Sequence, residues 1–191
     1  MCIRDSFLNN DILIPKSGWL KKLVETIESN SRIAIVGCKL LYPNNLIQHA
    51  GCFLSKSFLS TLQVFYHRGR FESANKYSQI ESVPAVTFAT ALAKKDLVGK
   101  LDESYKMGYF EDMDKCCEVR KNGLEIYYNG NVQLYHYESA TLYKLPLKYW
   151  RKHQLNNCLL FRSRWLEWLT KDLKKNPQFY GWSETDLKKL I

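Results

Sequence analysis

The stretch Lys106-Met107-Gly108-Tyr109-Phe110-Glu111-Asp112-Met113-Asp114 places three carboxylates within four positions, directly after a glycine and two aromatic residues. Apolar residues then recur at helical spacing from Met113, and Gly123 is a typical stop signal. The pattern predicts a helix of about three turns with the carboxylates in its first turn. Because a helix N-terminus stabilises negative charge, we expect these carboxylates to be ionised. An ionised carboxylate held in position is suited to act as a general base.

Acidic residues at the start of a helix also have a purely structural interpretation, because such residues cap free backbone amides. Spacing alone leaves that alternative open. The neighbouring sequence favours a functional one. Gly99-Lys100-Leu101-Asp102-Glu103-Ser104-Tyr105 precedes the stretch, and Tyr135-His136-Tyr137-Glu138-Ser139 follows it after an expected strand.

This order of elements resembles the second half of a family 2 glycosyltransferase with a GT-A fold. In that family a G-x-(F/L)-D-E element leads to (Y/F)-F-E-D-x-D and then to a strand that ends in histidine. The resemblance covers about residues 7–140, and residues 101–136 are its most specific part. It implies an α/β fold: the C-terminal half of a GT-A mixed sheet flanked by helices, plus a helical basic tail. The expected division is an unmatched leader (1–6), a partial GT-A domain (7–140) and the basic tail (141–191).

Asn9-x-Asp11 stands where the family has its D-x-D motif, after an expected buried strand that ends near Phe7. A divalent ion at this motif bridges the diphosphate of a nucleotide-sugar, and such an ion prefers hard oxygen ligands. The resemblance therefore implies that Asp11 is a metal ligand and that Asn9 is a weaker, neutral contact. Taken alone, Asn-Asn-Asp is equally typical of a turn.

His136 ends a segment in which Val132, Leu134 and His136 share one face of a strand. A histidine among apolar neighbours is usually a satisfied core residue. The resemblance implies instead that His136 coordinates the metal, and an imidazole ligand favours manganese over magnesium. It also implies that Asp112 takes the proton of the acceptor hydroxyl and that Glu111 positions the acceptor or the base.

Other patterns predict local features with structural roles. His49 is expected to be a hydrogen-bonded structural histidine, and residues 87–91 lack a glycine that the family often has there. The remaining expectations are a helix capped by Ser17, a short buried strand of residues 33–36 closed by Gly37, a hairpin around residues 43–45, a tight turn at Asn129-Gly130 and a short final helix starting near Ser183.

The net charge of +9 is concentrated in the basic tail, where 11 Lys and Arg stand against 4 Asp and Glu. Tyr149, Trp150, Trp165 and Trp168 alternate there with cations. Such a segment suits a helix packed on the catalytic domain with its basic side in water, which we favour. Peripheral contact with a membrane is the second interpretation, and nucleic-acid stacking is a third, less favoured one.

The six cysteines form no C-x-x-C pair and no disulfide framework, which predicts a reducing compartment and hence the cytoplasm. Adjacent Cys116 and Cys117 are expected to pack inside the helix. No segment has the apolar length of a membrane span, and residues 1–6 do not resemble a signal peptide. With 46% hydrophobic residues, the chain can form a core.

These observations predict a metal-dependent (Mn or Mg) transfer of a hexosyl or rhamnosyl-type sugar from a nucleotide-sugar to a hydroxyl of a glycan or lipid-linked acceptor, in polysaccharide or cell-wall biosynthesis. Inversion at the sugar follows from the resemblance alone. The family has roughly a hundred residues before the D-x-D strand that cradle the nucleotide base. We therefore expect an N-terminally incomplete chain, whose activity alone is an open question. The alternatives are a non-catalytic basic module that binds membrane or nucleic acid, and a metal-dependent hydrolase, which needs more ligands than the sequence offers.

Overall fold

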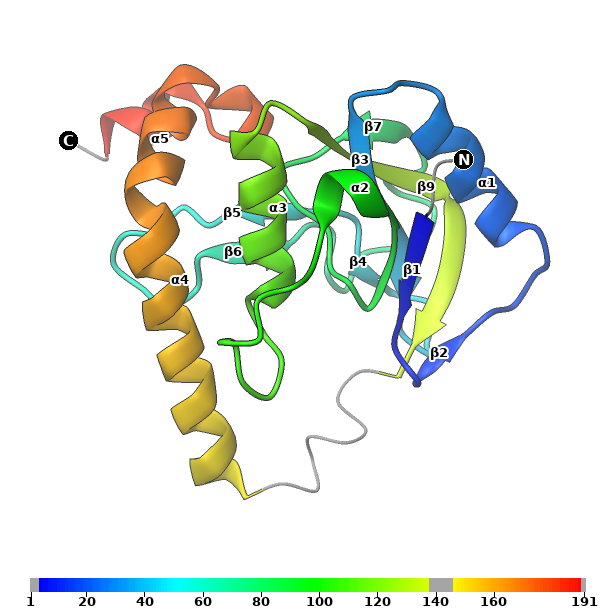
Figure 1. Cartoon of the computed structure of the whole chain (residues 1–191), viewed down its shortest axis with the longest axis horizontal. Helices are drawn as coiled ribbons and strands as arrows, with labels where there is room; N and C mark the ends of the chain where they lie inside the picture. The colour runs from blue at the N-terminus through cyan, green and yellow to red at the C-terminus, as the bar shows by residue number, and fades with distance from the viewer. Residues whose placement is uncertain (1–3, 138–145, 190–191) are drawn as a thin grey trace.

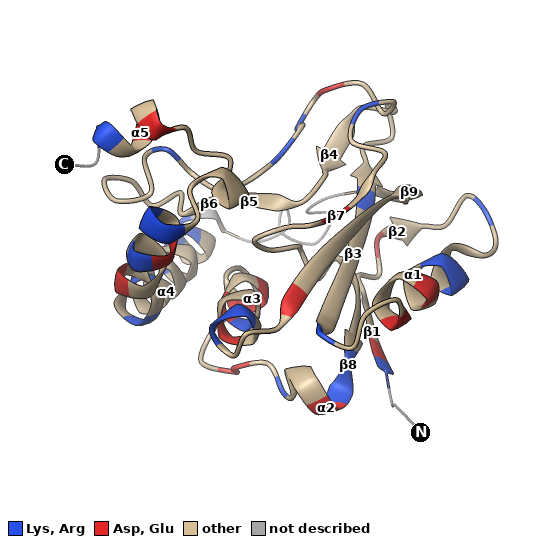
Figure 2. Ribbon diagram, turned by 90° about the horizontal axis from the view of Figure 1, so that it is seen from above, with Lys and Arg blue, Asp and Glu red and all other residues tan. Residues whose placement is uncertain are grey.

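The computed structural model describes residues 4–137 and 146–189 and shows a mixed β-sheet with helices on both faces (Figure 1). Helix α1 (Trp19–Glu28) covers one face. Helix α3 (Glu111–Lys121) covers the other face, and α4 (Leu147–Lys175) packs outside α3 (Figure 2). The predicted α/β fold with a helical C-terminal segment is confirmed. Glu138 and Ser139 of the quoted sequence pattern lie outside the described residues.

The centre of the sheet is formed by β3 (Ile33–Leu41) and β9 (Glu125–His136), which run parallel. On the other side of β3 lies antiparallel β8 (Thr90–Lys94), followed by β1 (Arg4–Leu8). Beyond β9 lies β2 (Ile12–Leu13). The remaining elements are β4 (Ile47–His49) on β3, β7 (Ile80–Ser82) on β9, a separate pair of β5 (Cys52–Leu54) with β6 (Phe65–His67), and helices α2 (Lys95–Val98), η2 (Gln178–Tyr180) and α5 (Glu184–Lys188).

Strand β3 is buried over all nine residues, as expected for a strand covered on both faces. The prediction that Gly37 closes this strand is wrong, since the strand continues to Leu41. A Cβ atom on Gly37 would lie 2.7 Å from the Cβ of Val86. Gly37 therefore serves close packing within the sheet rather than a turn. The hairpin that follows β3 forms as predicted, with Asn45 in a left-handed conformation.

The predicted turn at Asn129-Gly130 is also wrong, because both residues lie inside the continuous strand β9. The pairing of β9 with β3 shifts there: Cys38 pairs with Asn129, whereas the next residue of β3 pairs with Gln133. A Cβ atom on Gly130 would lie 2.1 Å from the carbonyl oxygen of Tyr77, so glycine permits this close approach. Strand β9 therefore has an odd number of extra residues at this point. Because side chains alternate between the two faces of a strand, the alternation is reversed for the residues that follow.

Two expectations near the N-terminus need correction. The strand before Asn9 is not buried: β1 lies at one edge of the sheet, and Leu8 is 44% exposed. Residues 4–6 of the expected leader belong to this strand. Helix α1 is not capped by Ser17, because its N-cap residue is Gly18 in a left-handed conformation, which has no side chain to accept a hydrogen bond.

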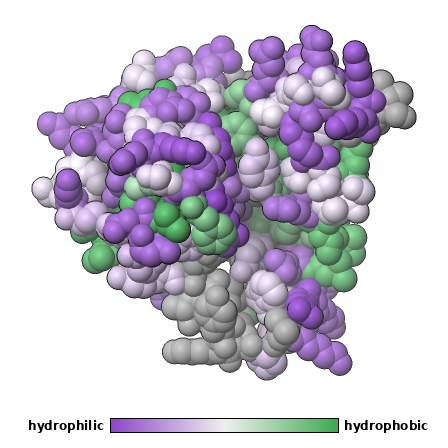
Figure 3. Space-filling view, turned by 180° about the vertical axis from the view of Figure 1, so that it is seen from behind, coloured by the Kyte–Doolittle hydropathy of each residue, from purple (hydrophilic) through white to green (hydrophobic). Residues whose placement is uncertain are grey.

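Helix α4 packs on the domain as favoured above. Phe161, Trp165, Leu169 and Leu173 are buried at intervals of four residues and belong to the core beneath α3. Ser183 caps α5 through a reciprocal pair of hydrogen bonds with Asp186, as predicted. No helix within the described ranges has the length and apolar character that crossing a membrane requires. On the face opposite that of Figure 1, the surface is mostly hydrophilic, with hydrophobic residues gathered in a central hollow (Figure 3).

Candidate active site

A cavity of about 1320 Å³ brings the predicted site residues together. Its walls are the β1–β2 connection, the segment before α3, the β5–β6 region and the N-terminal half of α4. The residues that line it include every one predicted for catalysis, donor binding or metal binding: Asn9, Asp11, Glu111, Asp112 and His136. Segments that lie at opposite ends of the sequence thus face one space.

Asp11 and His136 meet because β2 pairs with the end of β9. Ile12 is the partner of His136, and the Tyr137 amide donates to the Asp11 carbonyl oxygen at 3.0 Å. The Asp11 Oδ1 atom consequently lies 3.1 Å from His136 Nε2. The side-chain amide of Asn9 approaches the same ring nitrogen at 3.4 Å. The Asn9-x-Asp11 motif and the strand-end histidine therefore form one cluster.

Gln48 determines which nitrogen of the His136 ring carries the proton and which faces Asp11. The Gln48 amide nitrogen donates to the His136 carbonyl oxygen at 3.3 Å, which turns its Oε1 atom toward His136 Nδ1 at 2.6 Å. With the amide in this orientation, Nδ1 carries the ring proton in neutral His136, and Nε2 presents a lone pair to Asp11. A hydrogen-bonded carbonyl behind a histidine is the usual support of a metal-ligating ring.

The Asp11–His136 pair fits a divalent cation. The Asp11 Oδ1 atom is buried and accepts no hydrogen bond from any residue that the structure describes. A carboxylate oxygen and an imidazole lone pair therefore face each other across 3.1 Å, and a cation between them would relieve their repulsion. One oxygen and one nitrogen donor suit manganese, with magnesium as the harder alternative.

Glu111 and Asp112 open α3 from a neighbouring wall of the same cavity. The N-cap residue is Phe110, and no side chain caps this helix. Asp112 instead accepts hydrogen bonds from the Met113 amide at 2.8 Å and from the Phe88 amide at 3.4 Å. Glu111 has one buried carboxylate oxygen with no hydrogen-bond partner among the described residues. Asp112 thus satisfies one amide of the first turn of α3, whereas the buried oxygen of Glu111 has no such structural role.

The helix N-terminus was expected to favour the ionised form of these carboxylates, but both pKa values are raised rather than lowered. Burial raises the pKa of Glu111 to about 7, and the neighbouring charge of Asp112 adds to the increase. Burial also raises the pKa of Asp112, although hydrogen bonds from the Met113 and Phe88 amides oppose the shift. Loss of hydration outweighs the helix dipole at this site. A carboxylate that titrates near neutral pH is well matched to proton transfer.

The raised pKa of Glu111 makes stability depend on pH. Its usual pKa is 4.5, so the folded protein holds this proton more tightly than the unfolded chain does. The stabilisation is fully present below about pH 4.5 and is lost as the pH rises through about 7. We expect the free energy of unfolding to decrease between pH 4.5 and 8, and this decrease to be smaller by roughly 1–3 kcal/mol in Glu111→Gln. Denaturant titrations of both proteins across this pH range measure the difference. The same pH dependence in the two proteins would contradict the prediction.

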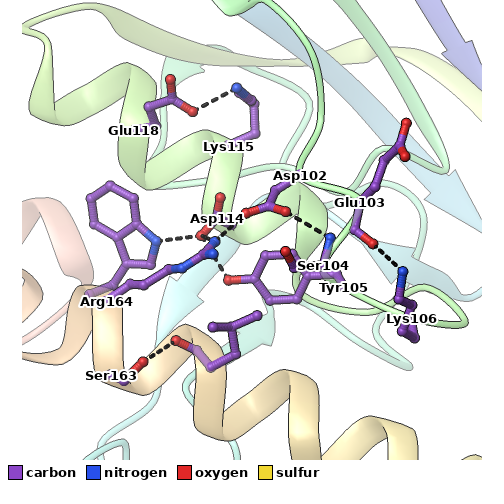
Figure 4. Close-up of polar contacts among 12 residues, drawn as sticks. Asp102, Glu103, Ser104, Tyr105, Lys106, Asp114, Lys115, Glu118, Ser163 and Arg164 are labelled. Atoms are coloured by element: carbon purple, nitrogen blue, oxygen red, sulfur yellow. Dashed lines mark hydrogen bonds and ion pairs between the residues drawn. The ribbon is translucent and has the colours of Figure 1, made fainter.

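Asp114, the third carboxylate of the stretch, has a structural role. It accepts hydrogen bonds from the Tyr105 hydroxyl and the Trp165 indole, each at 2.7 Å, and pairs with Arg164 at 3.3 Å (Figure 4). These partners join α4 to α3 and to the segment before α3. The three carboxylates therefore have two roles. Glu111 and Asp112 line the cavity, whereas Asp114 anchors α4, which forms one of the cavity walls.

Comparisons with known proteins bear on the fold that carries these residues. No protein-family model matches the sequence. An uncharacterized protein of Sinorhizobium fredii, y4gI, is 30% identical over 142 residues, and the O-antigen biosynthesis protein RfbC of Myxococcus xanthus is 26% identical over 141 residues. Each alignment covers 71% of this chain, which spans only 15% and 11% of those two proteins. A crystal structure of GalNAc-T7 with UDP, GalNAc and Mn²⁺ matches 70% of this chain and 27% of its own, with a TM-score of 0.50 and 12% identity.

The chain shares the GT-A fold of the GalNAc-T7 structure, and its sequence is similar to that of RfbC. These similarities confirm the predicted fold class and support the predicted glycosyltransferase relationship, whereas the finer assignment to family 2 stays a prediction. In this GT-A domain, the Asp11–His136 pair and the Glu111–Asp112 pair occupy two walls of one cavity.

The loop of this GT-A domain that leads into Glu111 has an unusual backbone. Four consecutive residues, 107–110, have positive φ angles of 63° to 77°, and only Gly108 among them is a glycine. Each of the other three costs roughly 1–2 kcal/mol. Asn157 of α4 holds this conformation: it accepts from the Lys106 amide at 3.1 Å and donates to the carbonyl oxygens of residues 106, 108 and 109. Strain of this kind persists only where surrounding contacts enforce it.

Replacing Asn157 should release this loop. Asn157 is 3% exposed, so Asn157→Ala leaves buried backbone groups without partners and should lower the free energy of unfolding by about 2–3 kcal/mol. Because the loop sets the position of Glu111 and Asp112, turnover should fall more than substrate affinity. The matched control is Asn156→Ala, at the neighbouring exposed position of α4. Equal stability of the two variants would show that Asn157 does not hold the loop.

The sequence analysis did not identify either supporting residue. Gln48 lies just after the predicted hairpin turn, and Asn157 lies in a segment interpreted from its aromatic and basic residues. Their partners are backbone atoms 88 and about 50 positions away. No periodicity or local motif marks such a residue, so only the fold reveals it.

Proposed function

We propose that this chain carries the metal, base and acceptor side of a glycosyltransferase site. The enzyme would transfer a hexosyl or rhamnosyl-type sugar from a nucleotide-sugar to a hydroxyl group of a glycan or lipid-linked acceptor. The observation that supports this proposal is the shared cavity: it is lined by a candidate cation site and by a carboxylate pair with raised pKa values. Transfer needs both in one space.

In the proposed reaction, Asp112 accepts the proton of the acceptor hydroxyl as that oxygen bonds to the anomeric carbon. The bond between the anomeric carbon and the diphosphate breaks in the same displacement, which inverts the configuration. The proton then passes from Asp112 to solvent. Glu111, through its unpaired buried oxygen, orients the acceptor beside Asp112.

Asp11 and His136 would hold a divalent ion, Mn²⁺ or Mg²⁺, with Asn9 as a weaker contact to the donor. Such an ion supplies electrostatic stabilisation of the leaving diphosphate. Arg70 and Arg151 also line the cavity, and their positive charges favour an anionic substrate group there. The donor diphosphate and a phosphate group of a lipid-linked acceptor are both groups of this kind.

We further propose that the enzyme belongs to family 2, works in polysaccharide or cell-wall biosynthesis, and acts in the cytoplasm, with any membrane contact peripheral and made through residues 141–191. The five described cysteines are all free and buried, which agrees with a reducing compartment. The name of RfbC, an O-antigen biosynthesis protein, supports the choice of pathway class.

Release of nucleoside diphosphate from a panel of UDP-, GDP- and dTDP-sugars tests the proposal. We expect release that requires Mn²⁺ or Mg²⁺, stops on chelation and increases when the correct acceptor is present. The rival basic binding module predicts instead a binding affinity that falls steeply with salt and ignores metal. Of the four aromatic residues on which that rival rests, Trp165 is buried and not available for stacking, whereas Tyr149 is 49% exposed. Absence of any metal-dependent nucleotide binding would overturn the transferase proposal.

A further inference from the structure

A second group of possible metal ligands lies at the junction of β4, β5 and β6. His49 ends β4, Cys52 begins β5, and His67 ends β6. Cys52 and His67 are direct partners in the β5–β6 pair, and a left-handed Gly51 bends the chain between His49 and Cys52. Three donors from three strands are thereby gathered at one point.

The distances among these donors resemble the edges of a tetrahedron around a metal ion. His49 Nδ1 lies 2.9 Å from His67 Nδ1, and Cys52 Sγ lies 3.7 Å and 3.9 Å from these two nitrogens. A tetrahedral Zn²⁺ ion with ordinary bond lengths separates two nitrogen ligands by about 3.3 Å and a nitrogen and a sulfur by about 3.6 Å. Shifts of a few tenths of an ångström would complete the geometry.

The surroundings also suit a bound ion. The Cys52 amide donates to the Ala85 carbonyl oxygen at 2.8 Å, and Arg68 donates to the carbonyl oxygens of Ala50 and Gly51, so the bend is held in place. The Arg68 guanidinium is paired with Glu81 and does not bring an uncompensated charge. Cys52 and His67 line the cavity described above, which gives an ion and a fourth ligand access.

We propose that His49, Cys52 and His67 form a three-ligand site for a thiophilic divalent ion, with Zn²⁺ as the best match. Thiolate and imidazole ligands select such ions, whereas the Asp11–His136 pair offers the oxygen donor that Mn²⁺ or Mg²⁺ prefers. Three protein ligands leave one coordination position for water or substrate. The ion would join β4, β5 and β6 and add positive charge to the cavity wall. This goes beyond the structural role expected for His49.

The alternative is a metal-free pair of hydrogen-bonded histidines, and it requires a different proton position. In that state the Gly51 amide donates to His49 Nε2 at 3.3 Å, and the proton on His49 Nδ1 is donated to His67. A metal on Nδ1 moves the proton of neutral His49 to Nε2 and breaks the Gly51 contact, which is long for a hydrogen bond. The two states are thus mutually exclusive and distinguishable.

Titration of the full chain with Co²⁺ under reducing conditions tests the proposal. We expect one equivalent to produce the intense visible bands of a tetrahedral site together with a thiolate-to-cobalt charge-transfer band, and Zn²⁺ to displace it. Cys52→Ser should abolish the charge-transfer band, and His67→Gln should weaken binding at least about 100-fold. Cys158→Ser, at another cysteine that lines the cavity, should change nothing. Asp11→Asn should also keep the band, which separates this site from the Asp11–His136 pair.

Absence of the charge-transfer band in the unaltered protein, or its persistence in Cys52→Ser, would overturn the proposal. Nitrogen-15 spectra of the histidine rings give a second measurement that needs no variant. Addition of Zn²⁺ should move the His49 proton from Nδ1 to Nε2, and unchanged ring spectra would favour the metal-free pair.

Discussion

Asp112→Asn is expected to lower the rate of sugar transfer by on the order of 10²–10⁴-fold, because an amide cannot accept the proton of the acceptor hydroxyl. The substitution keeps the size of the side chain, and its Oδ1 atom can still accept from the Met113 amide. Donor binding should therefore stay within about threefold of the original value. Steady-state kinetics with the donor and the acceptor titrated in turn measure both quantities.

Glu118→Gln is the matched control for Asp112→Asn. Glu118 lies on the exposed side of the same helix and pairs with Lys115 at 2.6 Å, away from the cavity. Removal of its charge should leave turnover unchanged, since Glu118 does not line the cavity. If Asp112→Asn retains full turnover, Asp112 is not the base, and Glu111 becomes the candidate to test next.

The residues of the candidate site could be predicted from sequence because their motifs are local. Asn9-x-Asp11, Glu111-Asp112 and the strand-end His136 each occupy a short pattern, and the structure places all of them on one cavity. Their protonation could not be predicted in the same way. The helix N-terminus suggested ionised carboxylates, whereas burial in the folded chain raises both pKa values.

Glycines account for two of the wrong predictions about the fold. Gly37 and Gly130 were interpreted as chain breaks, which is the commonest meaning of glycine between apolar runs. Both lie inside strands, at points where Val86 and the Tyr77 backbone approach too closely for a Cβ atom. The sequence shows that a side chain is absent at such a position, but it does not show which distant segment occupies the space.

For helix α4, packing on the domain was the favoured prediction, and Phe161, Trp165, Leu169 and Leu173 form the buried stripe that packs there. The contacts of its polar residues could not be predicted. Two of its polar residues, Arg162 and Asn157, bind the backbone of loops that lie next to the helix. Arg162 donates to the carbonyl oxygens of residues 58, 59 and 61, as Asn157 does for the loop before α3. This helix therefore shapes the site through backbone contacts that no sequence pattern records.

Asp11→Asn is expected to weaken the Mn²⁺-dependent binding of a nucleoside diphosphate by at least about 100-fold. The substitution removes the only anionic donor in contact with His136 among the described residues, and an amide oxygen is a weaker ligand for a divalent ion. Gln48→Ala should cost about 10–100-fold, because Gln48 orients the His136 ring without contacting the metal. Calorimetric titration with nucleoside diphosphate, with and without Mn²⁺, measures each effect.

Asp5→Asn is the control for charge alone, since Asp5 is an exposed carboxylate on β1. It should bind as the unaltered chain does. If Asp5→Asn and Asp11→Asn weaken binding equally, the effect comes from the overall charge of the chain and not from a metal ligand. If the unaltered chain binds neither Mn²⁺ nor nucleotide, the Asp11–His136 contact is a simple ion pair in this chain, and the donor role fails. Loss of binding in Asp11→Asn, together with loss of turnover but not binding in Asp112→Asn, would assign the two walls of the cavity to donor and acceptor.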